Sequence, residues 1–550
     1  MNQAEEISQL QELQPTKQAE RTWRWWSLAA LWVGMSVCIP TYLLGSYMIH
    51  GGLLWWEALV IIGIANVIIA FPMTLNAHAG TRYGISFPVM GRVAFGYQGV
   101  HLPALLRAIV ACGWFGVQTW VGGLAIDAIF AVVFGTTPEN DLSVSKFIAF
   151  AAFWCMNAYF IWKGTESIKW LEVISAPILL ALGIVLIGWG WQQVGSISGV
   201  LDAGLLFQKH TAFQLNDSTI QLNLLKTHNN EIRAKQYRIQ YIYNQQNIQS
   251  SWQKIPSTAQ LPLSKNTSTV SIQVCGKDTT QTSSWQSVQN TTTENSNNSL
   301  WNYLMWLNAM IGFWATMALS ISDISRFAYS QRDQFYGQLL GLPTTMALYS
   351  FVGIFVTYAA VLIFEDIFWV QDAPWDPVSL IAKIDSPMVT LIAQVLILIA
   401  TLSTNIAANI IAPANAIANF WNEKMELRKA GMIAATLGIL FCPWWLISEI
   451  SGILLIISAA LGPALGILLC DYWIIRKTNI DIHALYQAKG IYWYKFGWNP
   501  AALTANILGI IVALVGYWVE SLQFLYQISW FSGSITAAVV YWWLMRKKQN

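Results

Sequence analysis

Charged residues are scarce in this chain of 550 residues. Asp, Glu, Lys and Arg together make up 11% of it, whereas a soluble domain carries about 25%. The net charge is only +2, and no basic face suggests a nucleic-acid partner. Hydrophobic residues reach 55%, the mean hydropathy is +0.45, and apolar runs long enough to span a bilayer recur along most of the chain. We therefore expect a multi-pass protein of a lipid membrane.

Several kinds of chemistry lack the residues that they need. The six cysteines show no close spacing that would indicate a disulfide framework or a structural metal site. The six histidines are also dispersed, whereas a membrane enzyme would need His or acidic residues clustered at one membrane face. No GxxxxGKS/T stretch is present, which argues against a primary pump. We expect a protein that is not an enzyme and carries no cofactor.

The apolar runs predict twelve membrane helices. They lie near residues 27–48, 53–76, 102–134, 145–163, 170–193, 301–325, 337–364, 387–417, 431–447, 451–474, 499–519 and 525–546. Residues 1–22 are polar and the first apolar run is long enough to span, so no cleavable signal peptide is expected. With both termini in the cytoplasm, the short outer loops hold only Lys146 and Lys383, which agrees with the positive-inside bias. We predict a plasma (inner) membrane protein with cytoplasmic termini.

One polar segment, residues 207–300, interrupts this pattern. Within it YRIQYIYN (237–244) and STVSIQVCG (268–276) alternate like strands, and 289–299 is typical of a disordered linker. The helix count places this insert on the outer face, as a β-rich module without chemistry of its own or with an unknown outer-face partner. The predicted order is a cytoplasmic tail (1–26), helices one to five (27–206), the insert (207–300), helices six to ten (301–474), a cytoplasmic loop (475–498) and helices eleven and twelve (499–546).

Two predicted helices contain residues that interrupt a helix at membrane depth, where polar or broken backbone usually lines a cavity. The first contains GMSVCIPTY (34–42), in which Pro40 removes a backbone donor and frees carbonyl groups. The sixth contains Gly312, several hydroxyls and Asp323. These helices hold corresponding positions in two halves of five helices each. Paired interruptions of this kind indicate a transporter site built on inverted repeats.

The eighth predicted helix concentrates oxygen ligands. Ser403 and Thr404 lie one turn from Ala400, and Asn405 and Asn409 share a face. Two hydroxyls with freed backbone carbonyls can supply the hard oxygen ligands that Na⁺ needs. The alternative is that these side chains only bond neighbouring helices together. Four such residues within seven positions, opposite a broken helix, favour the cation site.

The third predicted helix carries an aromatic and an amide on one face. Trp114 and Gln118 are four residues apart within CGWFGVQTWVGG (112–123). The indole can stack on a planar ring, while the amide pairs with N–H and C=O groups on the ring's edge. With 30 Trp in the chain, one Trp can equally belong to an interfacial belt, but Trp114 lies deep in its span. Trp314 on the sixth helix is the candidate for a second aromatic face.

Five motifs resemble those of the first nucleobase–cation symporter family, which includes hydantoin, allantoin and uracil permeases. The motifs are NAHAGTRYGISFPVMGRVAFG (76–96), which resembles the family's inner loop, LRAIVACGWFGVQTWVGG (106–123), SISDISRFA (320–328), ATLSTNIAANIIAPA (400–414) and LGPALGILLCDYWIIRKTNIDIHALYQAKGIY (461–492). The resemblance covers nearly everything except the first 20 residues and the insert. It implies an all-α bundle of five-plus-five inverted repeats with two extra helices, working by alternating access.

The resemblance also implies a set of site residues. In hydantoin-type members two tryptophans, here Trp114 and Trp314, sandwich the ring. The other implied substrate contacts are Gln118, Asn409, the backbone at Phe313 and, on the first helix, Cys38. The implied Na⁺ ligands are the carbonyls of Gly34 and Val37 together with Ala400, Ser403 and Thr404. The chain departs from the family pattern in two ways. Cys38 stands where a polar side chain can contact the substrate, so the identity of the substrate stays open, and compact members of the family lack the insert.

Two questions stay open at this point. The first is function: we expect import of a planar nitrogen heterocycle by cation symport, and the alternative is a receptor that uses the insert as its sensor on a transporter scaffold. The second is the ion, Na⁺ or H⁺. Proton coupling would need a titratable group at depth. Asp323 is the only acid on the sixth helix, and its position near Arg326 favours a structural ion pair, so we expect Na⁺.

Overall fold

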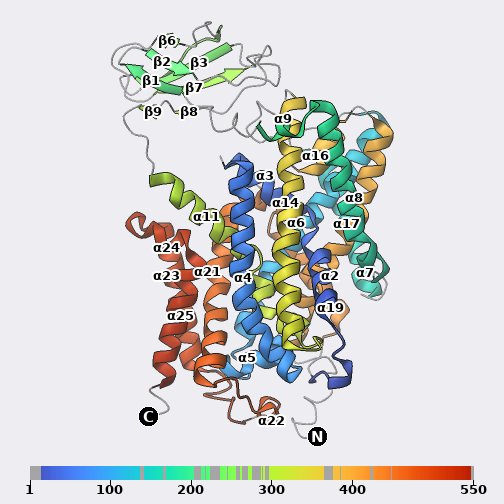
Figure 1. Ribbon diagram of the computed structural model, residues 1–550, viewed down its shortest axis with the longest axis vertical. Coiled ribbons are helices and arrows are strands. Elements are labelled where there is room, and N and C mark those ends of the chain that lie inside the picture. The colour runs from blue at the N-terminus through green and yellow to red at the C-terminus, as the bar shows by residue number, and fades with distance from the viewer. Residues whose placement is uncertain are drawn as a thin grey trace.

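The computed structural model describes residues 14–546, with gaps at 52, 137–141, 165–168, 365–375, 385, 421–424, 448 and 488. Between 203 and 296 it describes 212–216, 219–222, 236–243, 246–254, 260–262, 270–275, 286–287 and 289–290. The helices form a tall bundle, and the strands lie beyond one end of it, which we call the insert end (Figure 1). The last turn of α25 lies at the opposite end, which we call the terminal end (Figure 1).

The helices before the insert follow the predicted order. They are η2 (Gln18–Glu20), α2 (Trp25–Ser36), α3 (Ile39–His50), α4 (Trp55–Tyr83), α5 (Phe87–Phe95), α6 (His101–Phe134), α7 (Val144–Lys163), α8 (Lys169–Val194) and α9 (Ile197–Asp202). The first predicted helix is thus two helices, α2 and α3, separated by two residues.

The helices after the insert are more fragmented. They are α11 (Asn297–Phe313), α12 (Ala315–Ser320), α13 (Ser322–Ser325), α14 (Gln331–Ile363), α16 (Pro377–Ala382), α17 (Pro387–Asn409), α18 (Ile411–Phe420), α19 (Leu427–Leu440), α20 (Pro443–Leu446), α21 (Ile450–Leu469), η4 (Cys470–Ile475), α22 (Ile482–Leu485), α23 (Pro500–Trp518), η5 (Glu520–Leu522), α24 (Gln523–Gln527) and α25 (Ser529–Arg546). The sixth predicted helix is therefore also interrupted, between α11 and α12.

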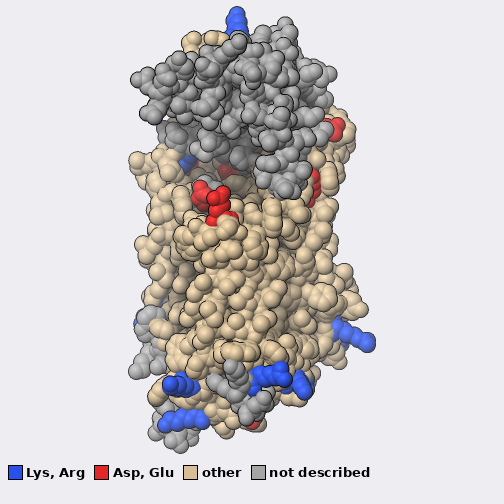
Figure 2. All heavy atoms as spheres, turned by 90° about the vertical axis from the view of Figure 1, so that its left-hand side faces the viewer, with Lys and Arg blue, Asp and Glu red and all other residues tan. Residues whose placement is uncertain are grey.

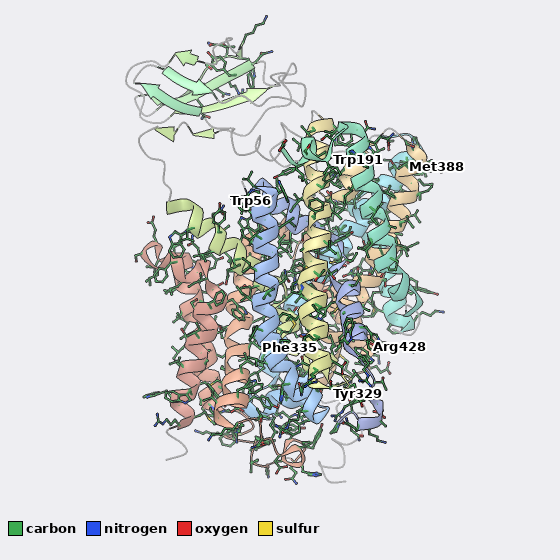
Figure 3. The ribbon with its side chains drawn as sticks, in the orientation of Figure 1. Trp56, Trp191, Tyr329, Phe335, Met388 and Arg428 are labelled. Atoms are coloured by element: carbon green, nitrogen blue, oxygen red, sulfur yellow. The ribbon has the colours of Figure 1, made fainter. Side chains whose placement is uncertain are left out.

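The described residues contain eight helices long and apolar enough to cross a membrane, and ten spans if each of two bent pairs counts as one. The bent pairs are α2 with α3 and the segment Glu520–Gln527 with α25. Two of the twelve predicted helices have no counterpart that passes this test, because α11 and α19 are only 17 and 14 residues long. Large exposed aromatics lie toward both ends, as in membrane-interface belts: Trp56 and Trp191 toward the insert end and Tyr329 toward the terminal end (Figure 3).

Several predicted boundaries were wrong by four residues or more, among them the start of α14 at Gln331 instead of 337. The second helix was expected to end at 76 and to be followed by a loop, but α4 continues to Tyr83 and α5 follows it. Polar side chains in this stretch donate hydrogen bonds to the broken sixth helix: Asn76 Nδ2 donates to the Ala318 carbonyl at 2.9 Å, and Thr81 Oγ1 donates to the Ser325 carbonyl at 2.9 Å. The ninth helix ends at Leu440, before 447, and the twelfth starts at Ser529, after a bend of 86°.

The helices pack in two groups. In the first group α14 packs against α2, α3 and α4, and α4 also packs against α11, α12 and α13. In the second group α6 packs against α7, α17, α18 and α19. Helix α8 contacts both groups through α14 and α17, while α21, α23 and α25 pack together beside α11. The two interrupted helices therefore belong to one group, and the predicted third and eighth helices belong to the other.

The insert contains strands, as its alternating segments predicted. A four-stranded sheet has the order β6-β2-β1-β9, and a five-stranded sheet has the order β4-β3-β7-β8 with β5 also paired to β3. The strands are β1 (Ala212–Asn216), β2 (Thr219–Leu222), β3 (Gln236–Tyr243), β4 (Gln246–Gln249), β5 (Gln253–Lys254), β6 (Gln260–Pro262), β7 (Val270–Cys275), β8 (Gln286–Ser287) and β9 (Gln289–Asn290). Most of the predicted linker at 289–299 lies outside the described residues, and α11 begins inside it, at Asn297.

Candidate functional site

The break between α2 and α3 releases two backbone carbonyls. The two helices meet at 63°. The Cys38 N–H donates to the Ser36 carbonyl at 3.0 Å, and the Thr41 N–H donates to the Cys38 carbonyl at 3.1 Å. In an uninterrupted helix these N–H groups would bond to the carbonyls of Gly34 and Val37. The two carbonyls that the sequence proposed as cation ligands thus lack their usual helical partners.

The side chains around this break are buried. Ser36 is fully buried, and its Oγ has no hydrogen-bond partner within the described residues. Cys38 is 4% exposed, and its Sγ lies 3.4 Å from Thr41 Oγ1. Pro40 lies in the first turn of α3, where proline is tolerated because no helical N–H is needed there. Proline therefore starts the second segment, and the break comes before it.

The break between α11 and α12 is lined by aromatic rings instead. It falls at Trp314, whose N–H donates to the Ile311 carbonyl at 3.2 Å. The Phe313 ring packs edge-to-face against Trp114 and against Trp314, with centroids 5.1 and 5.0 Å apart. Trp314 also packs edge-to-face on Trp32, at 5.1 Å. A phenyl ring thus contacts both indoles of the predicted sandwich.

Helix α17 presents the oxygen atoms predicted for the cation. Ala400, Ser403 and Thr404 are all buried. Ser403 Oγ has no hydrogen-bond partner in the described part of the chain. Thr404 Oγ1 lies 3.0 Å from the Ala400 carbonyl and 3.2 Å from Gln118 Oε1. The α17 hydroxyl assigned to the cation therefore contacts the α6 amide assigned to the substrate.

The amide of Asn409 is held by a buried polar network. Asn409 Nδ2 donates to Asn405 Oδ1 at 3.1 Å, along the shared face that the spacing predicted. Asn405 Nδ2 lies within 3.4 Å of Thr119 Oγ1, Asn157 Oδ1 and the Phe115 carbonyl. Buried polar groups that are satisfied in this way hold a side chain in place. Asn405 is therefore a positioning residue, because it joins α17 to α6 and α7.

Comparison with known proteins gives these residues a family context. Residues 15–220 and 276–533 match the family described as permeases for cytosine and purines, uracil, thiamine and allantoin. This chain belongs to that family of permeases. The matched ranges omit 221–275, which lies inside the insert. The predicted family resemblance, and the prediction that the chain is not an enzyme, are therefore confirmed.

Curated relatives match along nearly the whole chain. The purine-uracil permease NCS1 of Arabidopsis thaliana is 32% identical over 98% of this chain and 77% of its own length. The allantoin permease of Bacillus subtilis (strain 168) is 31% identical over 98% of this chain and 93% of its own length. Both are named as permeases, so the receptor alternative finds no support.

A solved structure shares the fold of this permease. The transporter Mhp1 of the nucleobase-cation-symport-1 family, in a closed conformation with bromovinylhydantoin bound, has a TM-score of 0.66 and 21% sequence identity. The match covers 98% of this chain and 95% of Mhp1. The predicted class, an α-helical membrane transporter of this fold, is confirmed.

The predicted site residues of this permease fall into four places in the bundle. Trp114, Phe313 and Trp314 form one aromatic cluster, and Gln118 and Thr404 contact each other. Cys38 lies at the first break with the released carbonyls, and Asn409 lies on the Asn405 network. Trp120, by contrast, packs against Phe147, Phe150 and Trp444, which agrees with ordinary packing.

Arg107 was not among the site residues predicted from the sequence. This buried cation lies on α6, seven residues before Trp114 and therefore close to the same helix face. Its Nε donates to the Thr316 carbonyl on α12 at 3.2 Å, which joins the two helix groups just beyond the sixth-helix break. The signal that could have identified it is a charge within an apolar run, which is costly at membrane depth.

Proposed function

We propose that this permease imports a small planar nitrogen heterocycle, such as a nucleobase, allantoin or a hydantoin, together with Na⁺. The observation that carries the proposal is the contact between Thr404 Oγ1 and Gln118 Oε1, 3.2 Å apart. A shift of the Thr404 hydroxyl when the ion binds would therefore move the Gln118 amide that contacts the substrate. Such a contact supports coupling, in which each ligand raises the other's affinity by the same factor.

The substrate part of the proposal rests on Trp114, Gln118 and Asn409. The Trp114 indole offers a face on which a planar ring can stack, and the two amides offer donors and acceptors for its edge. Phe313 and Trp314 complete the aromatic wall at the sixth-helix break. We propose that the Phe313 ring moves aside when a ligand enters between the indoles, while the backbone at this residue lines the pocket.

The cation part rests on the oxygens of the first break and of α17. We propose that Na⁺ is bound by the carbonyls of Gly34, Val37 and Ala400 and by the hydroxyls of Ser403 and Thr404. The buried Ser403 Oγ has no partner among the described residues, and an orphaned buried oxygen costs about 1–3 kcal/mol unless a ligand satisfies it. Among those residues no group of three His, Cys, Asp or Glu side chains could hold a metal, and hydroxyls with carbonyls suit a hard monovalent cation.

Proton coupling is the alternative, and Asp323 would be its carrier. The Asp323 carboxylate accepts a hydrogen bond from the Phe87 N–H at 2.8 Å, at the first residue of α5. Arg107 and Arg326 are its cationic neighbours. A carboxylate that caps a helix and faces two guanidinium groups has a structural role, which favours Na⁺.

We propose that the termini are cytoplasmic and that the insert lies outside the plasma (inner) membrane. Lys and Arg side chains gather at the terminal end of the face shown in Figure 2, while acidic side chains lie near the insert end. Positive loops face the cytoplasm. Labelling of single cysteines placed at 216 and 546 with a membrane-impermeant reagent in intact cells tests this orientation. Labelling at 546 but not at 216 would reverse it.

The insert is proposed to have no part in the transport cycle, whether or not it binds an outer-face partner. Its middle, 221–275, falls outside the family match. We expect a variant that lacks 207–296, rejoined by a short Gly/Ser linker, to retain uptake, because a surface insertion adds little loop-closure cost. The cut stops at 296 because α11 begins at Asn297. A folded deletion variant without uptake would assign the insert a role in capture or gating.

The direct test of function is uptake into proteoliposomes of purified protein. Radiolabelled uracil, allantoin, hydantoin and a purine are offered with an inward Na⁺ gradient, with no gradient, and with a pH gradient alone. We expect uptake of at least one ring to require the Na⁺ gradient. Uptake driven by the pH gradient alone would replace Na⁺ by H⁺, and no uptake of any ring would reject the substrate class.

A further inference from the structure

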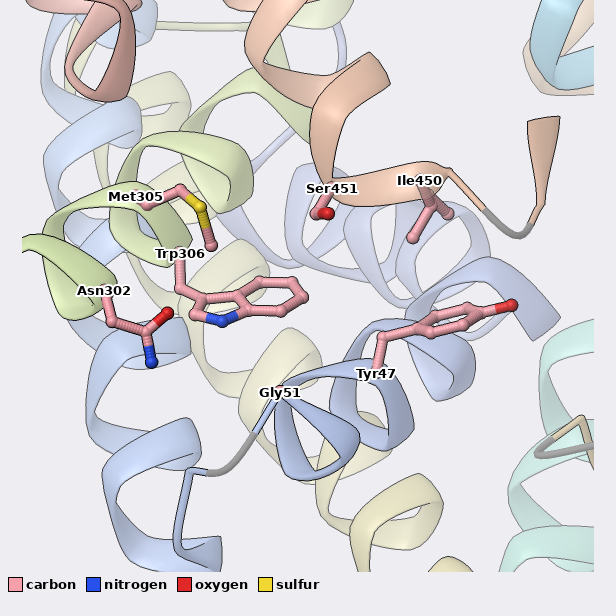
Figure 4. A pocket seen from close by; sticks show the side chains of 7 residues that line it. All are labelled: Tyr47, Gly51, Asn302, Met305, Trp306, Ile450 and Ser451. Atoms are coloured by element: carbon pink, nitrogen blue, oxygen red, sulfur yellow. The ribbon is translucent and has the colours of Figure 1, made fainter. Parts of the chain in front are cut away.

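A cavity of about 270 Å³ lies toward the insert end of the bundle, apart from the residues assigned to substrate and cation. Three helices form it: the end of α3, the first turns of α11 and the start of α21 (Figure 4). The lining residues are Tyr47, Gly51, Asn302, Met305, Trp306, Ile450 and Ser451. This volume lies just below the range of about 300–1,000 Å³ for pockets that hold drug-sized ligands, so the cavity suits a smaller ring.

Polar groups around this cavity lack protein partners. The indole of Trp306 is 4% exposed, and its Nε1 has no hydrogen-bond partner within the described residues. In that same part of the chain, no hydrogen bond satisfies the Asn302 amide, the Ser451 hydroxyl or the Tyr47 hydroxyl. Among these four groups the Trp306 N–H is the buried one, and a buried orphan donor costs about 1–3 kcal/mol unless a ligand satisfies it. The Asn302, Ser451 and Tyr47 groups belong to partly exposed residues, which leaves them open to a ligand that enters the cavity.

Gly51 keeps room beside the indole. A Cβ at this position would lie 2.9 Å from Trp306 Cζ2 and 3.1 Å from Trp306 Nε1. The distance to Cζ2 is shorter than real Cβ atoms show to their neighbours. The backbone φ of Gly51 is −71°, a value that any residue can adopt. Glycine is therefore needed here for space and not for backbone conformation. Any larger residue must push the indole from its place in the cavity wall.

The cavity repeats the chemistry of Trp114 and Gln118. Asn302 and Trp306 are four residues apart on α11, as Trp114 and Gln118 are on α6, so each pair puts an indole and an amide on one helix face. Trp306 is also seven residues, or about two turns, before Phe313 on α11. The cavity thus lies on the same side of α11 as the aromatic cluster, displaced toward the insert end.

We propose that this cavity, which we call the insert-end site, is a second binding site for a planar heterocycle with an amide edge. It receives the ring before the ring reaches Trp114. The Trp306 indole supplies the apolar wall, and Asn302 with Ser451 pairs with the ring's polar edge. This inference rests on the proposed function, because the entering ring is the transported substrate.

The test uses full-length protein and radiolabelled uracil and allantoin. Asn302→Leu removes the amide at similar volume, and Gly51→Ala displaces the indole. We expect each to raise the KM for uptake about tenfold, the effect of one unpaired polar group, with kcat unchanged. Asn302→Gln should restore most of the affinity. Leu300→Ala, an exposed position on the same helix, is the control and should change neither constant.

Equilibrium binding in detergent supplies a second readout. Wild-type protein should bind two rings per chain at saturation. Titration of Asn302→Leu and of Trp114→Ala should each show one of the two sites weakened about tenfold and the other unchanged. Two results together would overturn the insert-end site and leave the proposed function standing. They are a wild-type protein that transports but binds one ring per chain, and an unchanged KM in both insert-end variants. Absence of both binding and uptake in wild type would overturn both proposals.

Discussion

The two interrupted helices use the same backbone device for different chemistry. Between α2 and α3 the chain exposes carbonyl oxygens and the orphaned hydroxyl of Ser36. Between α11 and α12 it buries Phe313 and Trp314 against each other. A broken helix frees hydrogen-bonding groups in either case, but the side chains decide whether the gap suits an ion or a ring. The predictions below test this division.

The largest effect is expected at the ion side. Ser403→Ala combined with Thr404→Ala removes both α17 hydroxyls that we propose to bind Na⁺. Substrate should bind more tightly in NaCl than in choline chloride for wild type, by about 5- to 150-fold if the coupling is typical, and equally in both salts for the double variant. Isothermal titration in the two salts measures this difference.

The control for that experiment is Thr436→Ala, because Thr436 is exposed on α19 and bonds only its own helix among the described residues. It should keep the full difference between salts. If the double variant shows the same difference in substrate affinity between NaCl and choline chloride as wild type, Ser403 and Thr404 do not belong to the cation site.

The second effect concerns the ring side. Trp114→Ala removes the indole that packs against Phe313, and it should weaken substrate binding by about tenfold or more, since stacking on an aromatic contributes about 1–3 kcal/mol per ring. Trp120→Phe is the matched control, because the Trp120 ring packs against Phe147, Phe150 and Trp444 and not against the aromatic rings assigned to the site. It should lower the melting temperature and leave affinity unchanged. Equal affinity in Trp114→Ala and wild type would sink the stacking assignment.

Gln118 joins the two sides, so its variants should affect both. Gln118→Leu leaves the substrate edge without its amide partner, at a cost of about 1–3 kcal/mol, and removes the contact to Thr404, whose hydroxyl keeps the Ala400 carbonyl. We expect it to lower substrate affinity more than Gln118→Asn and to reduce the difference between NaCl and choline chloride. Uptake and titration in both salts measure the two effects. If Leu and Asn variants transport equally well, Gln118 is only structural.

Sequence patterns predicted what one helix can carry by itself. The shared face of Asn405 and Asn409, the hydroxyls of α17 and the pairing of Trp114 with Gln118 follow from helical spacing. The partners of those residues could not be predicted, because Asn157 and Trp32 lie on helices distant in sequence. The same reason explains α4, whose polar end was expected to be a loop: the groups that satisfy Asn76 come from α12.

The smallest effect should come from Ser36, which the sequence did not single out. Its hydroxyl is fully buried beside the released carbonyls and has no hydrogen-bond partner among the described residues. If it belongs to the ion's surroundings, Ser36→Ala should weaken Na⁺ affinity by about three- to tenfold, the net contribution of one polar contact. The stability of the variant should not fall, because removing a hydroxyl that has no partner leaves no group unpaired.

Ser350→Ala gives the opposite pattern: Ser350 Oγ donates to the Thr41 carbonyl across α14 and α3 at 3.3 Å, so this variant should lose stability and keep its Na⁺ affinity. Titrating substrate binding against NaCl, beside melting curves, separates the two. A Ser36→Ala protein with unchanged Na⁺ affinity would confine the ion to backbone oxygens and α17.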